Sequence, residues 1–231
     1  MRRIALLVGV CCVAGWQGGV AQGRVSGRIV VLEKHNKPSP DLGSAVVYLQ
    51  GPSPSPSSSL SPPPRPVTVE MAINDKEFVP RVVVVPAGST VRFPNHDPFD
   101  HNVFSASEPN QFDLGQYGRG AAKGWTFTSP GLVRVFCNVH PRMVAFVVVM
   151  ATRYYAQPAA DGSFAIDNVP AGSYTLQVWH ERSPQASEPV TIAAAGASGI
   201  EVQLDARGFR WVAHKNKYGQ DYPTNAGYER Y

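Results

Sequence analysis

The sequence predicts an all-β protein built from sandwich-like units. Among its 231 residues, 21 are Gly and 21 are Pro, while only 16% carry a charge. This composition is typical of short strands joined by tight turns. No stretch keeps a helical period for more than about two turns, whereas an average helix has about twelve residues. Short segments with alternating apolar residues instead recur along the chain, separated by turns that contain Gly and Pro.

Residues 1–21 are expected to be a secretory signal peptide. Arg2 and Arg3 precede an apolar run, and small residues lead up to Ala21, which is the order of such a peptide. The apolar run is shorter than the roughly 20 residues that span a bilayer. We therefore expect a periplasmic or secreted protein without stable membrane insertion.

Export changes both the charge and the cysteine count. The chain has 21 basic and 17 acidic residues, and loss of Arg2 and Arg3 leaves 19 basic residues. The numbers of basic and acidic residues are then nearly equal, which gives no electrostatic case for nucleic-acid binding. Cys11 and Cys12 leave with the signal peptide, so Cys137 has no partner for an internal disulfide. Pairing between chains, a free thiol and a metal ligand remain open, and the neighbours of Cys137 favour the metal.

The first part of the mature chain is predicted to hold two strands and a linker. Residues 22–50 contain two alternating segments, 25–32 and 45–49, joined by a long polar turn. Residues 51–66 are dominated by Pro and Ser. They cannot bury enough apolar surface to fold, and we expect an exposed linker or loop.

Residues 67–151 are predicted to form a β-sandwich. At least five short apolar segments follow one another here, with Gly and Pro in the turns between them. The last two segments, 132–136 and 144–150, flank a loop that contains Cys137.

Residues 152–206 are predicted to form a small antiparallel β module. Asp161-Gly162 and Pro170-Ala171-Gly172 are turn signals between alternating segments. The sequence leaves open whether residues 22–50 complete this module or belong to the sandwich that follows them. The tail, 207–231, is aromatic and basic, and we expect a strap laid across a domain surface.

The loop between the last two strands of the sandwich carries three metal-ligand side chains. Cys137, His140 and Met143 have the spacing Cys-x-x-His-x-x-Met. A mononuclear blue copper site takes two His and one Cys, with a weak axial Met. The missing imidazole has two candidates upstream, His96 and His101. Asn102 and a strand-like segment follow His101, which favours it, and His96 is the alternative ligand.

The same loop closely resembles the ligand loop of amicyanin, a short-loop, plastocyanin-like blue copper protein of the cupredoxin family. Thr126-Phe127-Thr128 and Pro130-Gly131 precede it as in that family, and His101-Asn102-Val103 is similar to its first ligand region. The resemblance covers residues 67–151 and implies a Greek-key cupredoxin sandwich. It implies one type 1 copper ion, and the ligand set is His101, Cys137, His140 and Met143.

The resemblance also assigns supporting roles. The backbone amide of Asn102 is expected to hydrogen-bond to the thiolate and tune its potential. Pro141 restricts the loop beside His140. Pro141 and Phe99 are expected to surround the edge of His140 as an apolar electron port.

Residues 152–206 resemble the carboxypeptidase regulatory-like, or prealbumin-type, module, which is usually non-catalytic. The whole chain is similar to larger secreted bacterial proteins labelled methylamine utilisation proteins. These resemblances imply one-electron transfer, with transient docking to a redox partner such as a c-type cytochrome or a dehydrogenase. The alternative is a non-redox copper-binding or envelope scaffold protein. No Ser/His/Asp motif supports an enzyme, and residues 115–124 lack the form of a phosphate loop.

Overall fold

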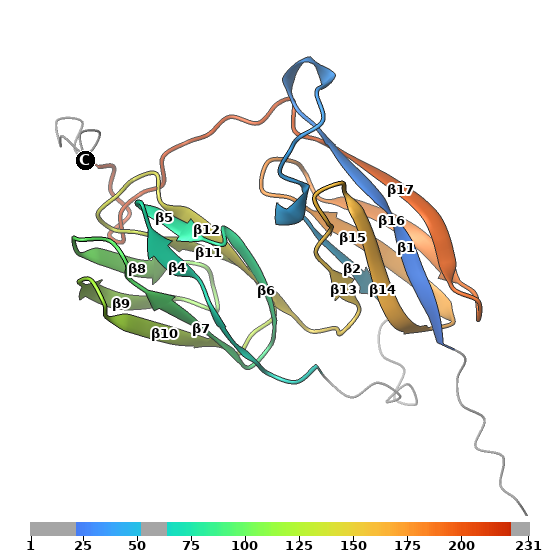
Figure 1. The fold of residues 1–231 in the computed structure, drawn as a ribbon, viewed down its shortest axis with the longest axis horizontal. Helices are drawn as coiled ribbons and strands as arrows, with labels where there is room; N and C mark the ends of the chain where they lie inside the picture. Colours follow the sequence, from blue (N-terminus) through green and yellow to red (C-terminus); the bar gives the residue numbers. More distant parts are fainter. Residues whose placement is uncertain (1–21, 52–63, 223–231) are drawn as a thin grey trace, which may run out of the picture.

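The computed structural model describes residues 22–51 and 64–222 and shows two β-sandwich units packed side by side (Figure 1). We call residues 67–150 the central unit, and the strands before and after it the outer unit. Nearly all regular structure in the described ranges is β; the exceptions are two short 3₁₀ turns, η1 (Lys34–Asn36) and η2 (Leu42–Ser44). Within those same ranges, no helix is both long enough and apolar enough to cross a membrane. The predicted signal peptide and most of the predicted linker lie outside the described residues.

The central unit consists of two facing sheets and a small hairpin. The larger sheet, in the order β6-β12-β11-β8-β9, contains β6 (Val82–Pro86), β8 (His101–Ser105), β9 (Phe112–Tyr117), β11 (Gly131–Phe136) and β12 (Val144–Met150). The smaller sheet, in the order β10-β7-β3, contains β3 (Thr68–Glu70), β7 (Ser89–Pro94) and β10 (Ala122–Phe127). The hairpin pairs β4 (Ala72–Asn74) with β5 (Glu77–Val79). Apolar side chains from both sheets form one core between them.

The N-terminal strand pair, residues 22–50, belongs to the outer unit. Its first sheet, in the order β14-β1-β17, contains β1 (Gln22–Leu32), β14 (Ser163–Pro170) and β17 (Ala197–Asp205). Its second, in the order β13-β2-β15-β16, contains β2 (Val46–Gln50), β13 (Tyr155–Ala156), β15 (Gly172–Trp179) and β16 (Ala186–Ile192). The strand pair thus completes the C-terminal module. One expectation was wrong: the alternating segments of residues 152–206 do not pair with each other across their turn, because β14 and β15 lie in different sheets. The outer unit also contains a parallel pair, β1 with β17, a long-range pairing that turn signals do not reveal.

Strand β12 explains how the two units hold together. Its sequence is apolar at almost every position, as in strands buried on both faces. Ala145, Val147 and Val149 enter the core of the central unit. Phe146, Val148 and Met150 instead enter a separate cluster that includes Val46 of β2, with Tyr48 and Trp179 packed against it. The units therefore share a third buried layer.

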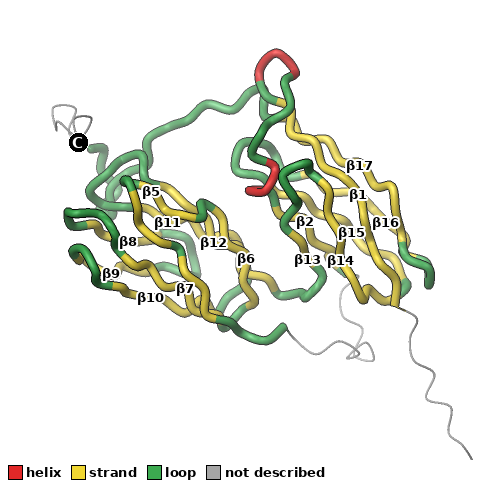
Figure 2. The backbone as a smooth tube through the Cα atoms, viewed as in Figure 1, coloured by secondary structure: helices red, strands yellow, loops and turns green. Residues whose placement is uncertain are grey.

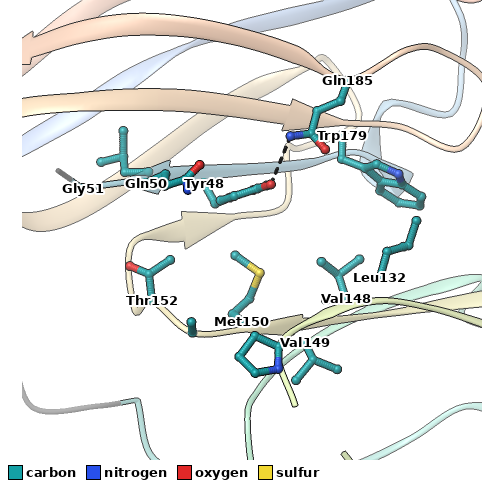
Figure 3. A pocket seen from close by; sticks show the side chains of 14 residues that line it. Tyr48, Gln50, Gly51, Leu132, Val148, Val149, Met150, Thr152, Trp179 and Gln185 are labelled. Atoms are coloured by element: carbon teal, nitrogen blue, oxygen red, sulfur yellow. Dashed lines mark hydrogen bonds between the residues drawn. The ribbon is translucent and has the colours of Figure 1, made fainter. Parts of the chain in front are cut away.

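Directional contacts reinforce this interface. The rings of Phe146 and Trp179 lie 5.2 Å apart in an edge-on arrangement. The Arg81 guanidinium of the central unit donates two hydrogen bonds to the Glu181 carboxylate of the outer unit, at 2.8 and 2.9 Å. A cavity of about 610 Å³ lies beside the same layer (Figure 3). Tyr48, Met150 and Trp179 line it, and none of the four proposed metal ligands does.

Replacing Phe146 by alanine is expected to lower the free energy of unfolding by roughly 3 kcal/mol, because truncating a buried Phe removes apolar contacts and leaves a cavity. Urea denaturation of the copper-free protein measures the change. Leu132→Ala on the neighbouring strand is the control, since Leu132 is an exposed residue. A loss for Phe146→Ala no larger than that of the control would mean that the shared layer contributes little to stability.

The outer unit also contains a buried histidine, His180, whose titration is expected to affect stability. Burial, followed by the nearby Arg182 charge, lowers the pKa of His180 below 6.5. The unfolded chain therefore takes up a proton at a higher pH than the folded chain does. Stability is retained above about pH 6.5 and falls as the pH drops from there toward the folded pKa, by at most about 1.4 kcal/mol per pH unit. Denaturation at several pH values should show a shallower acid slope for His180→Gln. Equal slopes for both proteins would contradict the assignment.

Candidate metal centre

The seven residues from Cys137 to Met143 connect β11 to β12 at one end of the central unit. The two strands are antiparallel, and Phe136 is paired with Val144, so the loop starts and ends at the same point of the sheet. The backbone N–H of Cys137 donates to the Met143 carbonyl oxygen at 3.3 Å, and that of Met143 donates to the His140 carbonyl oxygen at 3.1 Å. The hairpin thereby folds the Cys-x-x-His-x-x-Met spacing into a compact turn.

Strand β8 delivers the second imidazole to this loop. His101 is its first residue, and Nδ1 of His101 lies 3.7 Å from Sγ of Cys137. Nδ1 of His140 also lies 3.7 Å from that sulfur. These three ligand atoms are all within 4.8 Å of one another. Two imidazoles and a thiol that are distant in sequence thus converge on one point.

The donor set fits a metal ion. A sulfur and a nitrogen that share a trigonal ion at bond lengths of about 2.0–2.3 Å stand about 3.7 Å apart, which is the separation in each of the two Cys–His pairs. Cys137 and His101 are both 0% exposed, and Met143 is buried in the same core. Two imidazoles and a thiolate with a neighbouring thioether are the ligands of a blue copper site. The assignment of Met143 as the axial ligand stays a prediction.

His96 does not lie in this cluster. Its side chain is exposed, and its backbone N–H donates to the carbonyl oxygen of Ile73 at 2.9 Å. The geometry therefore favours His101 over His96 as the first imidazole.

The sulfur of Cys137 is surrounded by backbone N–H groups. Val139 donates to it at 3.4 Å, and the backbone amides of Asn102 and His140 also hydrogen-bond to it. Burial raises the pKa of the Cys137 thiol, and these three donors oppose that rise. The thiol accordingly has to release its proton when a metal ion binds. The hydrogen bond from the Asn102 backbone amide to the Cys137 sulfur is the contact predicted from the sequence.

Both imidazoles are neutral at physiological pH and so available as ligands. Burial lowers the pKa of His140 to about 4, and the nearby His101 adds to the effect. Burial also lowers the pKa of His101, although its hydrogen bond to Asp97 works in the opposite direction. The ring of Phe99 contacts both, with centroids 5.2 Å from His101 and 5.7 Å from His140. His140 and Pro141 are only partly buried, so this side of the centre reaches the surface.

Asp97 is a site residue that the sequence reasoning missed. Its buried carboxylate lies 2.7 Å from Nε2 of His101, the ring nitrogen that faces away from Cys137. Burial alone raises the pKa of Asp97, but hydrogen bonds from Lys76, His101 and Asp75 outweigh it and lower the pKa. The charged carboxylate fixes the His101 tautomer with Nδ1 free to coordinate. The only signal in the sequence was an acidic residue four positions before a candidate ligand. The conformation of the loop decides whether the carboxylate of that residue faces the ligand.

Comparisons with known proteins give one family model and several solved structures. Residues 118–199 match a family described as polysaccharide lyase family 4, domain II, a stretch that begins in the central unit and ends in the outer one. No curated protein matches the sequence. Among solved structures, a purple cupredoxin from Nitrosopumilus maritimus is 22% identical and has a TM-score of 0.32, with 36% of this chain and 99% of that one covered.

Two further solved structures are similar to the chain. Amicyanin from Paracoccus versutus is 22% identical, with 44% of this chain and 91% of that one covered and a TM-score of 0.33. A copper-containing nitrite reductase from Thermus scotoductus SA-01 is 30% identical, with a TM-score of 0.34; the match covers 43% of this chain but only 26% of that one. The central unit is a β-sandwich of two facing sheets with the His-Cys-His cluster at one end.

Proposed function

We propose that the protein is an exported blue copper protein that carries single electrons. The observation that carries the proposal is the convergence of His101, Cys137 and His140, whose nitrogen and sulfur atoms stand 3.7 Å apart in each Cys–His pair. Cys137, Met143 and the two imidazoles would hold a copper ion there, and this mixture of thiolate, thioether and imidazole ligands would suit both Cu(I) and Cu(II). The similar proteins whose names include cupredoxin, amicyanin and copper-containing nitrite reductase support the choice of copper.

The protein's own contribution is a ligand set that is already in place. His101 lies on a strand and is held by Asp97, and Cys137 directly follows a strand. Backbone N–H groups point at the sulfur, so negative charge on it is stabilised without rearrangement. A site that changes little between oxidation states lowers the cost of transferring an electron.

The partly buried edge of His140 is the proposed electron port. His101 is fully buried, whereas His140 reaches the surface beside Pro141 and Phe99. A redox partner, for example a c-type cytochrome or a dehydrogenase, docks on this face transiently over a small area, as is typical of electron-transfer encounters. On this proposal the protein acts as an electron carrier in the periplasm or outside the cell.

Reconstitution of the full chain with Cu(II) tests the proposal. We expect an intense visible absorption from thiolate-to-copper charge transfer and a reversible one-electron couple in voltammetry. Zn²⁺, which has no redox chemistry, is the matched control and should give neither signal. A colourless Cu(II) complex without a reversible couple contradicts electron transfer and favours the alternative, a non-redox copper-binding or scaffold protein.

A further inference from the structure

The C-terminal tail leaves the outer unit and crosses to the metal end of the central unit. After β17 ends at Asp205, residues 207–222 run as loop without strand pairing and reach the region of β8 and β11 (Figures 1 and 2). Side-chain contacts and isolated backbone hydrogen bonds therefore hold the tail against the central unit. These contacts fall on the ligand loop.

Three tail residues bond to the ligand loop itself. The hydroxyl of Tyr222 donates to the carbonyl oxygen of Cys137 at 2.8 Å. The backbone N–H of Lys217 donates to Oδ1 of Asn138 at 2.8 Å. Nε2 of His214 lies 3.3 Å from the carbonyl oxygen of His140. Two of the contacted loop residues are proposed copper ligands, and the contacts are to their backbones, so they restrain the loop while the ligand atoms stay free.

Aromatic stacking fixes the tail against the strand that precedes Cys137. The ring of His214 stacks on Phe136, with centroids 4.5 Å apart and planes inclined by 27°. Tyr222 meets the other side of this cluster, with its ring edge-on to His214 at 5.4 Å. The tail is therefore anchored at the residue next to the thiolate.

A second chain of contacts reaches the opposite side of the sulfur. Nζ of Lys217 donates to Oδ2 of Asp113 at 2.6 Å, and Oδ1 of Asp113 accepts from Nδ2 of Asn102 at 2.7 Å. Asn102 is the residue whose backbone N–H bonds to Cys137. One short segment of the tail thus contacts the ligand loop directly and is linked to Asn102 through Asp113.

We propose that residues 214–222 form a clamp that positions the copper-ligand loop, with His214, Lys217 and Tyr222 as positioning residues. The inference rests on the proposed function, because its consequence is a ligand geometry that resists change on oxidation and a metal ion that leaves slowly. Without the clamp, the loop is held across its base by the hydrogen bonds between Cys137, Met143 and His140. With the clamp, the backbone carbonyl groups of Cys137 and His140 also contact the tail, which continues from β17 of the outer unit.

Tyrosine-to-phenylalanine variants of the full-length copper protein test the clamp. Tyr222→Phe removes only the hydroxyl that bonds to Cys137, a loss of about 1 kcal/mol. We expect copper release to an excess of chelator to become roughly five-fold faster, together with a shift of the visible and EPR spectra. Tyr155→Phe is the matched control, because it makes the same chemical change on β13 of the outer unit, outside both the tail and the ligand loop; it should leave both readouts unchanged.

Variants of His214 separate the stack from the polar contact. His214→Ala removes both and is expected to speed copper release by roughly ten-fold. His214→Phe keeps a ring against Phe136 and should restore part of the slow release. If wild type is blue and redox-active but Tyr222→Phe and His214→Ala behave like Tyr155→Phe, the clamp is wrong and the proposed function stands. If wild type shows no blue copper spectrum, the proposed function itself fails.

Discussion

Replacing Cys137 by serine is expected to abolish the intense visible absorption of the copper-loaded protein. The absorption arises from charge transfer between thiolate and copper, and a serine hydroxyl is neither soft nor ionised at neutral pH. Copper affinity should also fall sharply, because a harder, neutral oxygen replaces the thiolate. Absorption and EPR spectroscopy of the reconstituted variant measure the first effect, and competition with a Cu(I) chelator measures the second.

Val139→Ala is the control for this experiment. Val139 lies two residues further along the same loop, and its backbone N–H, which alanine retains, donates to the Cys137 sulfur. The band should persist in this variant with a small shift at most. An intense band that survives in Cys137→Ser would place the chromophore elsewhere and overturn the assignment of Cys137, the one free cysteine in the described part of the chain.

Replacing Asp97 by asparagine is expected to weaken copper binding by roughly 10–100-fold, the usual cost of losing the carboxylate that orients a ligand histidine. Asparagine keeps the shape of the side chain but removes the charge that sits 2.7 Å from Nε2 of His101. That ring then loses the fixed tautomer and orientation that leave Nδ1 free for the metal. Titration against a competing chelator at pH 7 measures the change.

Asp100→Asn supplies the comparison for Asp97. Asp100 belongs to the same loop and is exposed, so its charge reaches His101 only through space and is screened by solvent. Its replacement should change copper affinity by less than about three-fold. Equal effects of the two substitutions would show that the loop's total charge matters and that the hydrogen bond from His101 to Asp97 does not.

Much of the fold followed from local sequence because local chemistry specifies it. The alternating segments gave the last two strands of the central unit, and the ligand spacing placed Cys137, His140 and Met143 on the hairpin loop between them. Turn signals located the turns around Gly162 and Gly172, which lead into β14 and β15, although these two strands lie in different sheets. A strand's side-chain period and a turn's need for particular backbone angles are properties of a few consecutive residues, so a single sequence reveals them.

The sequence alone determined that this chain is an all-β protein with a thiol, an imidazole and a thioether on one loop. Only the tertiary structure decided that His101 and not His96 meets that loop, that Asp97 holds the ring, and that residues 22–50 complete the outer unit. The tertiary structure also decided that the Tyr222 hydroxyl bonds to the backbone of Cys137, 85 positions away in sequence. The physical reason is that these outcomes depend on contacts between distant segments, whose partners are selected by packing across the whole fold and leave no local periodicity to read.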